Sequence, residues 1–332
     1  MQKRLQKVKV CAPPRIHMGL IDCGRATDRL YGGAGFSFDG LCTSVSASPA
    51  EEWRVEFADQ VKHSLRTEDE VDQLISRLED VDVPPVEITI DKMAPEHVGL
   101  GSKTTLLQSV ALAAFCARNI PYSKSHIVKL TRRGGASGIG VNTFWSGGLI
   151  VDGGHHLAKQ DRQFQPSSHR VPDNIPPILA RVDMPKDWSV AIFYDPNFLG
   201  IEGKREALIF SEVMPVEEIQ CLTALSLIYH GVLPSIHEHN LKTLSAAIHD
   251  LNNTGMKKIE VSQQSVMTQK CLAAFWQNGL PAGLSSFGPC IYVIGETNGE
   301  EIETAKKIAT TYALIDLGKY HFRKRGVTIK QS

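Results

Sequence analysis

The sequence predicts an α+β fold with two lobes. Strand patterns and helical patterns alternate along the 332 residues without the regular βαβ spacing of a doubly wound sheet. A chain of this length can bury a large core and divide into two lobes. The segment 160–185 is polar and rich in proline, so we place the boundary within it. The N-terminal lobe is then residues 1–165 and the C-terminal lobe is residues 166–332.

In the N-terminal half, β-branched and aromatic residues alternate with polar ones in five segments, which predicts strands. These segments are Val8–Ala12, Gly35–Asp39, Cys42–Ser48, Trp53–Phe57 and Val86–Asp91. The glycines of Tyr31–Gly35 indicate a turn. Apolar residues at helical spacing predict a helix over Glu68–Leu78, a largely buried helix from residue 102, and a helix over Lys124–Arg133.

The same signals continue in the C-terminal half. They predict strands over Ser189–Tyr194, Cys290–Ile294 and Val327–Lys330. They predict helices over Val216–Tyr229, Ile236–Leu251, Val261–Gln277 and Glu300–Thr311. Neither an internal repeat nor a low-complexity segment interrupts this pattern.

The composition excludes several classes of function. The 36 basic and 36 acidic residues balance, which argues against a general nucleic-acid or membrane-surface binder. The seven cysteines are scattered singly, as in a reduced cytoplasmic protein. We find no signal-peptide pattern and no run of 18 apolar residues, so we expect no membrane span and a cytoplasmic location.

The segment Pro95–Thr104 is the strongest candidate for a binding site. Gly99 and Gly101 allow backbone amides to approach a ligand closely, and Ser102 is a good N-cap for the helix that follows. The free N–H groups of that helix favour a phosphate, and Lys103 adds a positive charge. The segment is not a Walker A loop, because Ser102 rather than glycine precedes the lysine. A purely structural turn is the alternative.

Two further segments combine charge with small residues. Arg15, His17 and Asp22 offer a guanidinium for an anion, a proton donor and a ligand for Mg²⁺. The alternative is a surface turn in which the arginine and the aspartate pair. Arg132 and Arg133 precede a loop of small residues and suggest a second anion site. The alternative is a solvated helix end, where cations complement the helix dipole.

Two more positions complete the set. Asp152 ends a short apolar run that indicates a buried strand, and carboxylates at strand ends often reach a site. Ser285 and Ser286 precede the strand Cys290–Ile294, where small hydroxyl residues suit a sugar-phosphate pocket. An ordinary turn explains these two serines equally well.

Together these segments resemble the GHMP kinase superfamily. Its members carry an N-terminal Pro-x-Arg segment, a P-x-x-x-G-L-G-S loop, a later P-S-G-x-D segment and a C-terminal glycine/serine loop. Residues 95–102 match the second motif in full, and the resemblance spans about residues 8–330. One position departs: where the kinases carry the aspartate that serves as catalytic base, this chain has Gly140. Glycine cannot accept a proton from a substrate hydroxyl.

A non-kinase branch, the β-ribofuranosylaminobenzene 5′-phosphate synthases, is more similar. The shared signatures are the runs 15–22, 133–141, 148–155 and 285–289. The resemblance implies a GHMP-kinase-like fold, with a ribosomal-protein-S5-domain-2-like N-terminal lobe and a ferredoxin-like C-terminal lobe. It also implies condensation of 5-phosphoribosyl-1-diphosphate with 4-aminobenzoate or 4-hydroxybenzoate, with release of CO₂ and diphosphate, in tetrahydromethanopterin biosynthesis. We expect Mg²⁺ as cofactor, no ATP, no nucleic-acid or membrane partner, and a homodimer.

The roles that we expect follow from motif position and residue type. His17, Asp22 and Asp152 are the expected catalytic residues, with Asp22 and Asp152 also as Mg²⁺ ligands. The expected phosphate- and substrate-binding residues are Arg15, Gly99, Leu100, Gly101, Ser102, Lys103, Thr104, Arg132, Arg133, Ser137, Gly138, Ser285 and Ser286. Two alternatives stay open. One is an ATP-dependent small-molecule kinase with a base such as Asp152, and the other is a non-catalytic binding protein of the same fold.

Overall fold

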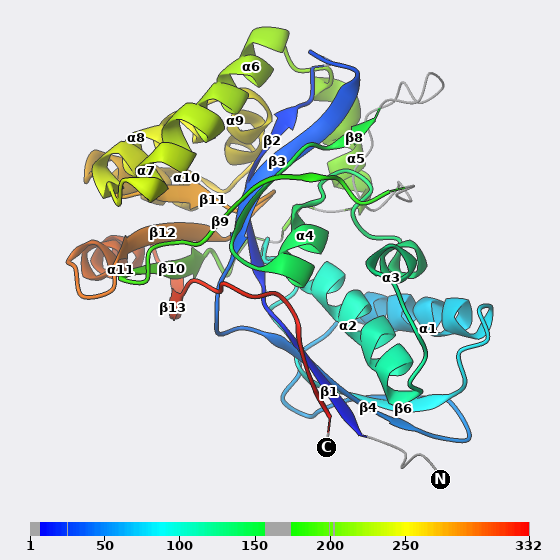
Figure 1. The fold of residues 1–332 in the computed structure, drawn as a ribbon. Helices are drawn as coiled ribbons and strands as arrows, with labels where there is room; N and C mark the ends of the chain where they lie inside the picture. Colours follow the sequence, from blue (N-terminus) through cyan, green and yellow to red (C-terminus); the bar gives the residue numbers. More distant parts are fainter. Residues whose placement is uncertain (1–6, 25, 157–173, 199, 202, 332) are drawn as a thin grey trace.

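The computed structural model describes residues 7–24, 26–156, 174–198, 200–201 and 203–331. Three β-sheets and the helices that cover them form an α+β fold, as the sequence predicts (Figure 1). The expected lobe boundary at 165/166 lies outside the described residues. The last strand pairs with the first strand, so both ends of the described chain lie at the same end of the molecule (Figure 1).

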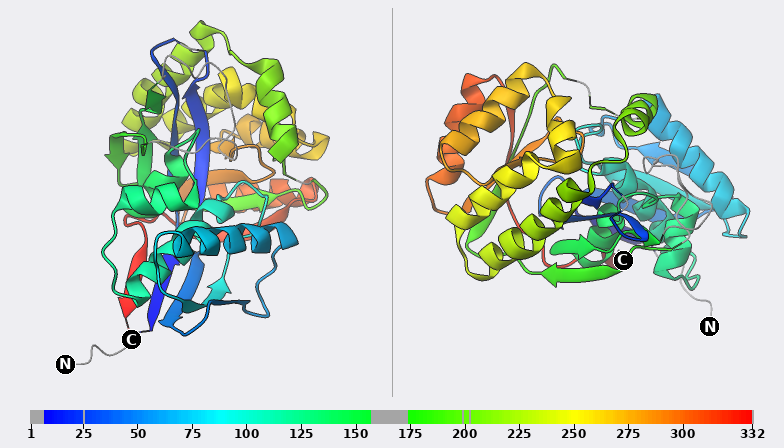
Figure 2. Two further views of the ribbon diagram at one scale, coloured as in Figure 1. Left: turned by 90° about the vertical axis from the view of Figure 1, so that its right-hand side faces the viewer. Right: turned by 90° about the horizontal axis from the view of Figure 1, so that it is seen from above.

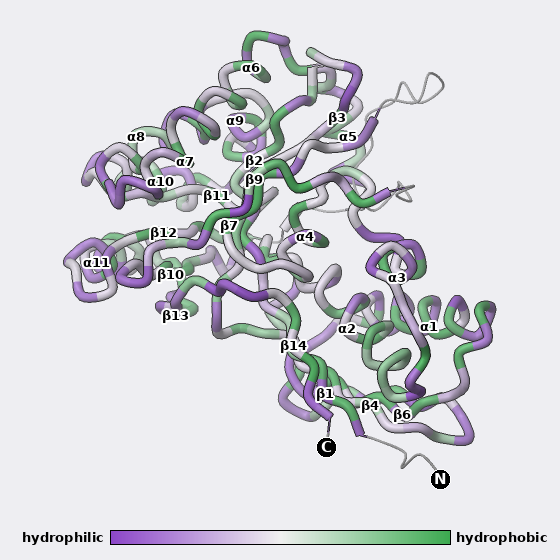
Figure 3. Tube along the Cα trace, in the orientation of Figure 1, coloured by the Kyte–Doolittle hydropathy of each residue, from purple (hydrophilic) through white to green (hydrophobic). Residues whose placement is uncertain are grey.

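The first sheet has the strand order β14-β1-β4-β6-β5. Its strands are β1 (Val8–Ala12), β4 (Thr43–Pro49), β5 (Arg54–Phe57), β6 (Val86–Lys92) and β14 (Thr328–Gln331). The helices α1 (Leu65–Glu79), α2 (Ser102–Ala117) and α3 (Lys124–Thr131) cover one face of this sheet (Figure 1). Because α2 is buried on nearly every side, its sequence is apolar all round instead of on one stripe (Figure 3).

The second sheet carries the long strands that reach the site. It has the order β2-β3-β7-β9, with β8 (His155–His156) also on β3. Its members are β2 (Arg15–Asp22), β3 (Arg29–Ser37), β7 (Leu149–Asp152) and β9 (Ile178–Val182), and α4 (Ile139–Ser146) packs against it. The turn expected at Tyr31–Gly35 is wrong, because these residues lie within β3. A Cβ on Gly35 would overlap both the Ile16 carbonyl oxygen and the Ile139 side chain, so the glycine serves close packing.

The third sheet has the order β11-β12-β10-β13. Its strands are β10 (Trp188–Tyr194), β11 (Ala282–Leu284), β12 (Ile291–Glu296) and β13 (Ile315–His321). The accompanying helices are α6 (Glu218–Ser226), α7 (Leu233–His237), α8 (Leu241–Asn252), α9 (Gly255–Ser262), α10 (Val266–Gln277) and α11 (Glu301–Thr311). They gather on one side of the molecule, away from α1 and α2 (Figure 2).

Several boundaries differ from the sequence prediction. The helix α5 (Gly203–Val213) and the strand β13 were not expected. The helix expected over Val261–Gln277 is two helices, α9 and α10, because the Ser265 hydroxyl caps a new N-terminus. A π-helical turn, Leu227–Val232, joins α6 to α7 without a break.

That joined stretch, Glu218–His237, bears on the expectation that no helix spans a membrane. Its length and its mean hydropathy of 1.4 meet the requirement for a membrane-crossing helix. A core helix of a soluble protein meets the same requirement, and this stretch packs against α8 and β2. Length and composition alone are therefore weak evidence for a span.

Candidate functional site

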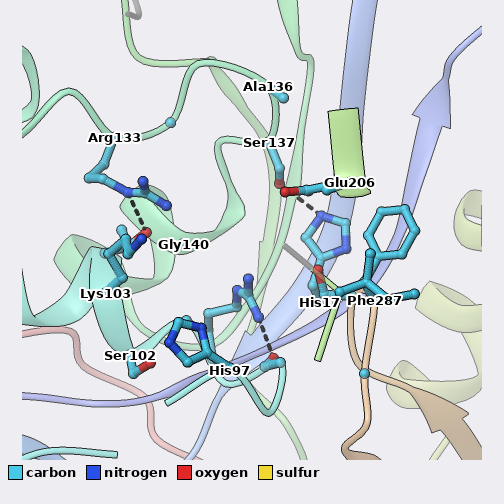
Figure 4. A pocket seen from close by; sticks show the side chains of 18 of the residues that line it. His17, His97, Ser102, Lys103, Arg133, Ala136, Ser137, Gly140, Glu206 and Phe287 are labelled. Carbon is cyan, nitrogen blue, oxygen red and sulfur yellow. Dashed lines mark hydrogen bonds between the residues drawn. The ribbon is translucent and has the colours of Figure 1, made fainter. Parts of the chain in front are cut away.

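Segments that are far apart in the sequence meet at one cavity of about 190 Å³. Residues from β2, the glycine loop before α2, the loop before α4 and the loop before β12 line it (Figure 4). The sequence-predicted residues on its wall are Arg15, His17, Gly99, Gly101, Ser102, Lys103, Thr104, Arg133, Ser137 and Ser286. The glycine loop and the small-residue loop thus open onto the same cavity. The four segments meet as the sequence predicts.

The glycine loop presents the start of α2 to the cavity. Gly99 and Gly101 have φ angles of 91° and 73°, in the region that favours glycine. Gly101 is the N-cap, and Ser102 is the first helical residue, so the expectation of Ser102 as N-cap is wrong. Leu100 is buried in the core and does not line the cavity, although its carbonyl accepts a hydrogen bond from the Arg15 amide at 3.0 Å.

Arg15 crosses this loop and is aimed at the cavity. Its Nη1 donates to the Gly99 carbonyl, and its side chain packs over Gly101. Its buried Nε has no hydrogen-bond partner among the described residues. Burial, and next the charge of Arg133, lowers the pKa of the guanidinium to about 10, so it stays charged at neutral pH. A buried donor without a partner is costly, and an anion in the cavity would satisfy it.

His17 follows on the same strand and contacts the second loop. Its Nε2 lies 2.8 Å from the Ser137 hydroxyl (Figure 4). Burial, and then the charges of Arg15 and Lys257, hold the pKa of His17 well below its ordinary value. The imidazole is therefore neutral at physiological pH and acts as a hydrogen-bonding group.

The two neighbouring arginines separate. Arg133 lines the cavity, and its Nε donates to the Thr104 hydroxyl at 3.1 Å (Figure 4). Arg132 ends α3 in a left-handed conformation with φ 51°, is exposed, and does not line the cavity. Arg132 therefore points away from this cavity, because the chain reverses at this residue, and its contact with substrate stays a prediction.

Lys103 and Arg66 add two more cations to this wall. The Lys103 ammonium lies 2.6 Å from the Glu70 carboxylate, and the Arg66 guanidinium lies 3.6 Å from the same oxygen. Glu70 orders both side chains beside the start of α2. The cavity wall therefore carries four basic side chains near the start of α2, which suits a multiply charged anion; they are Arg15, Arg66, Lys103 and Arg133.

The side of the cavity around Phe287 is largely apolar, and Glu206 is its charged member (Figure 4). Phe210 and Phe287 lie with ring centroids 6.1 Å apart, and the wall residues Leu20, Ala136 and Ile201 belong to the same buried cluster. A flat aromatic ring would bury its faces here without loss of hydrogen bonds. The cavity thus carries its basic groups at one end, whereas the other end is apolar except for Glu206.

The two serines have different positions. Ser285 is fully buried: its hydroxyl donates to the Gly99 carbonyl at 2.7 Å and accepts from the His17 amide at 3.1 Å. It therefore joins β2 to the glycine loop and does not line the cavity, contrary to expectation. Ser286 does line the cavity.

The two aspartates expected as catalytic residues and Mg²⁺ ligands do not fit that role. The Asp22 carboxylate accepts hydrogen bonds from the amides of Gly24, Ala26 and Thr27, at 3.1–3.2 Å, and from the Thr27 hydroxyl at 3.2 Å. It holds its own loop and does not line the cavity. Asp152 is fully buried and is also absent from the wall.

Asp152 is enclosed by backbone. Its Oδ1 accepts from the Gly154 amide at 2.9 Å, and Gly138 covers the carboxyl from the other side. Gly138 is the N-cap of α4 and, contrary to expectation, lies off the cavity wall. Burial raises the pKa of Asp152 to about 7. Among the described residues, no group of three His, Cys, Asp or Glu side chains has metal-binding geometry, so we assign no step to a metal.

Part of the cavity wall consists of residues that no sequence pattern indicated. Glu206 and Phe210 come from the unexpected helix α5, and further residues of this kind include Arg66, Glu96, His97, Glu260 and Phe287. Glu96 precedes the glycine loop and accepts from the Ser64 amide at 2.9 Å, which fixes the start of α1. No local pattern marks these residues, because isolated glutamates at helical spacing are typical of exposed faces.

Comparison with known proteins gives a consistent result. The chain is 32% identical over 294 residues to the β-ribofuranosylphenol 5′-phosphate synthase of Methanocaldococcus jannaschii, covering 86% of this chain and 88% of that protein. It is 30% identical over 289 residues to the protein of the same name from Methanothermobacter thermautotrophicus, covering 85% and 87%. No family model matches the sequence.

Solved structures with low sequence identity share the fold. The homoserine kinase of Cytophaga hutchinsonii superposes with a TM-score of 0.68 at 14% identity, covering 99% of each chain. The phosphomevalonate kinase of Streptococcus pneumoniae superposes with a TM-score of 0.69 at 11% identity, covering 96% of this chain and all of that one. The chain therefore has the GHMP kinase fold, as expected.

Proposed function

The chain belongs to the β-ribofuranosylphenol 5′-phosphate synthase family, and on that premise we propose that it transfers a phosphoribosyl group to a para-substituted benzoate. The donor is 5-phosphoribosyl-1-diphosphate. A carbon–carbon bond forms between the anomeric carbon and the ring carbon that carries the carboxylate. CO₂ leaves from that ring carbon, and diphosphate leaves from the sugar.

The division of the cavity into two ends carries this proposal. The start of α2, with Lys103, Arg133 and Arg15, gathers positive charge and free donors at one end. Phe210 and Phe287 form the apolar other end. The first end suits the phosphates of the donor and the second suits a benzoate ring, so the anomeric carbon would lie between them.

The reaction needs charge stabilisation more than a strong base. As the bond from the anomeric carbon to diphosphate breaks, negative charge grows on the leaving group and positive charge grows on the sugar. Lys103, Arg133 and the α2 amides stabilise the departing diphosphate. Loss of CO₂ restores the aromatic ring, so the overall exchange takes no proton from the acceptor ring. This chemistry agrees with glycine at position 140.

We take 4-hydroxybenzoate as the acceptor, because the relatives are named for a ribofuranosylphenol and this acid yields a phenol. The neutral His17, oriented by the Ser137 hydroxyl, would hold a polar group of the acceptor by a hydrogen bond. A neutral imidazole can form this hydrogen bond without transferring a proton to the acceptor.

Isotope release tests the proposal. The enzyme is incubated with 5-phosphoribosyl-1-diphosphate and 4-hydroxybenzoate labelled with ¹⁴C in the carboxyl group, and ¹⁴CO₂ is collected. We expect one CO₂ for each diphosphate released, and the same assay with 4-aminobenzoate ranks the acceptors. Formation of ADP from ATP and an alcohol, without ¹⁴CO₂, would establish the kinase alternative. Binding of both substrates without turnover would establish the non-catalytic alternative.

Other expectations stay predictions. They are the need for Mg²⁺, the absence of ATP from the reaction, the homodimer, the cytoplasmic location and the place in tetrahydromethanopterin biosynthesis. If Mg²⁺ is required, ligands other than Asp22 and Asp152 must hold it, because hydrogen bonds within the protein occupy the first and burial encloses the second. Activity after treatment with EDTA, with and without added Mg²⁺, measures the requirement.

A further inference from the structure

A buried ion pair lies at the cavity wall, where Glu260 lines the cavity and Lys257 does not. Lys257 and Glu260 on α9 contact each other through their charged groups, and their side chains are only 1% and 3% exposed. Residues of these types are almost never buried this deeply unless they are paired. A buried pair also adds little stability over apolar residues of the same size. Stability alone is therefore a poor explanation for this pair.

The Lys257 ammonium lies among three backbone carbonyls from two parts of the site. Its Nζ is 3.2 Å from the Leu284 oxygen and 3.5 Å from the oxygens of His17 and Ser286. The His17 oxygen also accepts from the Ser286 amide at 3.1 Å. The ammonium is thus the point where β2 and the loop before β12 meet.

The loop before β12 needs contacts that stabilise its backbone conformation. Ser286 has a φ of 54°, in the left-handed region that a residue with a side chain rarely adopts. Gln264, just after α9, donates to the Phe287 carbonyl at 2.9 Å. Contacts from α9 and the residues after it therefore fix Ser286 and Phe287, both of which line the cavity.

Glu260 has a second effect on the cavity wall. It lines the cavity close enough to Arg15 that its charge partly offsets the lowering of the pKa of that guanidinium by burial. Its carboxylate contacts Lys257, while the buried Nε of Arg15 has no partner in the described part of the chain. By holding this carboxylate, Lys257 leaves the Arg15 donor available for an anion.

We propose that Lys257 is a positioning residue of the site: its ammonium ion ties the carbonyl of His17 to those of Leu284 and Ser286, and Glu260 holds that ion in place. The inference rests on the proposed function. Its effect on His17 is measurable without turnover, because Lys257 and Arg15 are the two charges that, after burial, lower the pKa of the imidazole.

The test compares Lys257→Met, the double variant Lys257→Met/Glu260→Gln, and Lys258→Met as a matched control. Lys258 is the exposed neighbour on the same helix. The single variant leaves Glu260 buried without a partner, so we expect a large loss of thermal stability. The double variant removes the buried charge, so we expect its Tm to return close to that of the wild type.

Activity separates positioning from stability. In the double variant we expect kcat/KM to fall on the order of 100-fold, mainly in kcat, because the reacting groups are misplaced while the phosphate contacts remain. We also expect the NMR titration of His17 to move toward its ordinary pKa. Lys258→Met should change neither quantity.

A double variant with wild-type kcat/KM and an unchanged His17 titration would overturn the inference. Absence of turnover in the wild-type enzyme would instead contradict the proposed function. In that case the His17 titration still decides whether Lys257 positions the imidazole.

Discussion

Substitution of Arg133 by methionine tests the anion-binding end of the cavity, and Arg132→Met is its matched control. The two residues are adjacent and carry the same charge. Only Arg133 lines the cavity, whereas Arg132 is exposed at the end of α3. A general effect of net charge would weaken donor binding equally in both variants. The loss of a direct contact would weaken binding in Arg133→Met alone.

The expected magnitude follows from the donors of Arg133. Its Nε is already bonded to the Thr104 hydroxyl, so its two Nη groups remain for a phosphate. A hydrogen bond to a charged group contributes about 1.5–3 kcal/mol. Allowing for incomplete additivity, the loss of both weakens binding by at least ~2 kcal/mol, or about 30-fold in Kd. Part of this loss is offset because Arg133 no longer repels Arg15.

The assay is isothermal titration of 5-phosphoribosyl-1-diphosphate into each variant, with thermal unfolding as the control for folding. We expect Arg133→Met to bind about 30-fold more weakly or worse, and Arg132→Met to stay within about twofold of the wild type. The Tm of both variants should shift by only a few degrees. Equal weakening in the two variants, or an unchanged Kd for Arg133→Met, would refute the assignment of the phosphates to this wall.

Four further substitutions, at three positions, test other parts of the site. Lys103→Ala should weaken binding of 5-phosphoribosyl-1-diphosphate about 10-fold with a small change in Tm. A large loss of Tm with an unchanged Kd would show that the lysine is structural and acts only through its 2.6 Å contact with Glu70. A Cβ on Gly140 would meet Thr104 at 3.4 Å, so Gly140→Ala should keep activity within a few-fold of the wild type. Gly140→Asp places a carboxylate beside the bound anion, so it should abolish donor binding without creating kinase activity. ADP production from ATP by the aspartate variant would contradict this expectation. Burial raises the pKa of Asp152 from 3.8 to about 7. Between about pH 4 and pH 7 the folded protein therefore keeps a proton on Asp152 that the unfolded chain has lost. The free energy of unfolding of the wild type falls as the pH rises through this range. The Tm of Asp152→Asn relative to the wild type should therefore increase between pH 5 and pH 8, and a constant difference would show that the carboxyl is already ionised at pH 5.

The sequence predicted the meeting of four segments because each carries a local backbone requirement. Gly99 and Gly101 need positive φ angles that few other residues adopt, and a loop of this kind presents free backbone amides at the start of the helix that follows. The small residues before α4 also allow close approach of backbone and side chain. Such requirements are visible in one segment without knowledge of its neighbours.

The direction of single side chains could not be predicted in the same way. Arg132 and Arg133 have equal chemistry, and only the left-handed backbone at the end of α3 turns one of them away. Asp22 has the chemistry of a metal ligand, but the amides that follow it in its own loop occupy its oxygens. Which partner a polar group takes is decided by tertiary structure.

Lys257 and Glu260 show most clearly what a sequence pattern does not predict. A lysine and a glutamate three residues apart on a short helix are typical of a solvated face. The structure buries both, because α9 packs against β2 and β11. Their role depends on three carbonyls from other segments, which no local pattern reveals.

The most direct test of the central claim is a crystal structure with 5-phosphoribosyl-1-diphosphate and 4-hydroxybenzoate bound. We predict the diphosphate at the start of α2 between Lys103 and Arg133, and the benzoate ring against Phe210 and Phe287, with the anomeric carbon facing the ring carbon that bears the carboxylate. Electron density that places the two substrates in separate cavities, or the diphosphate away from the α2 amides, would contradict the account.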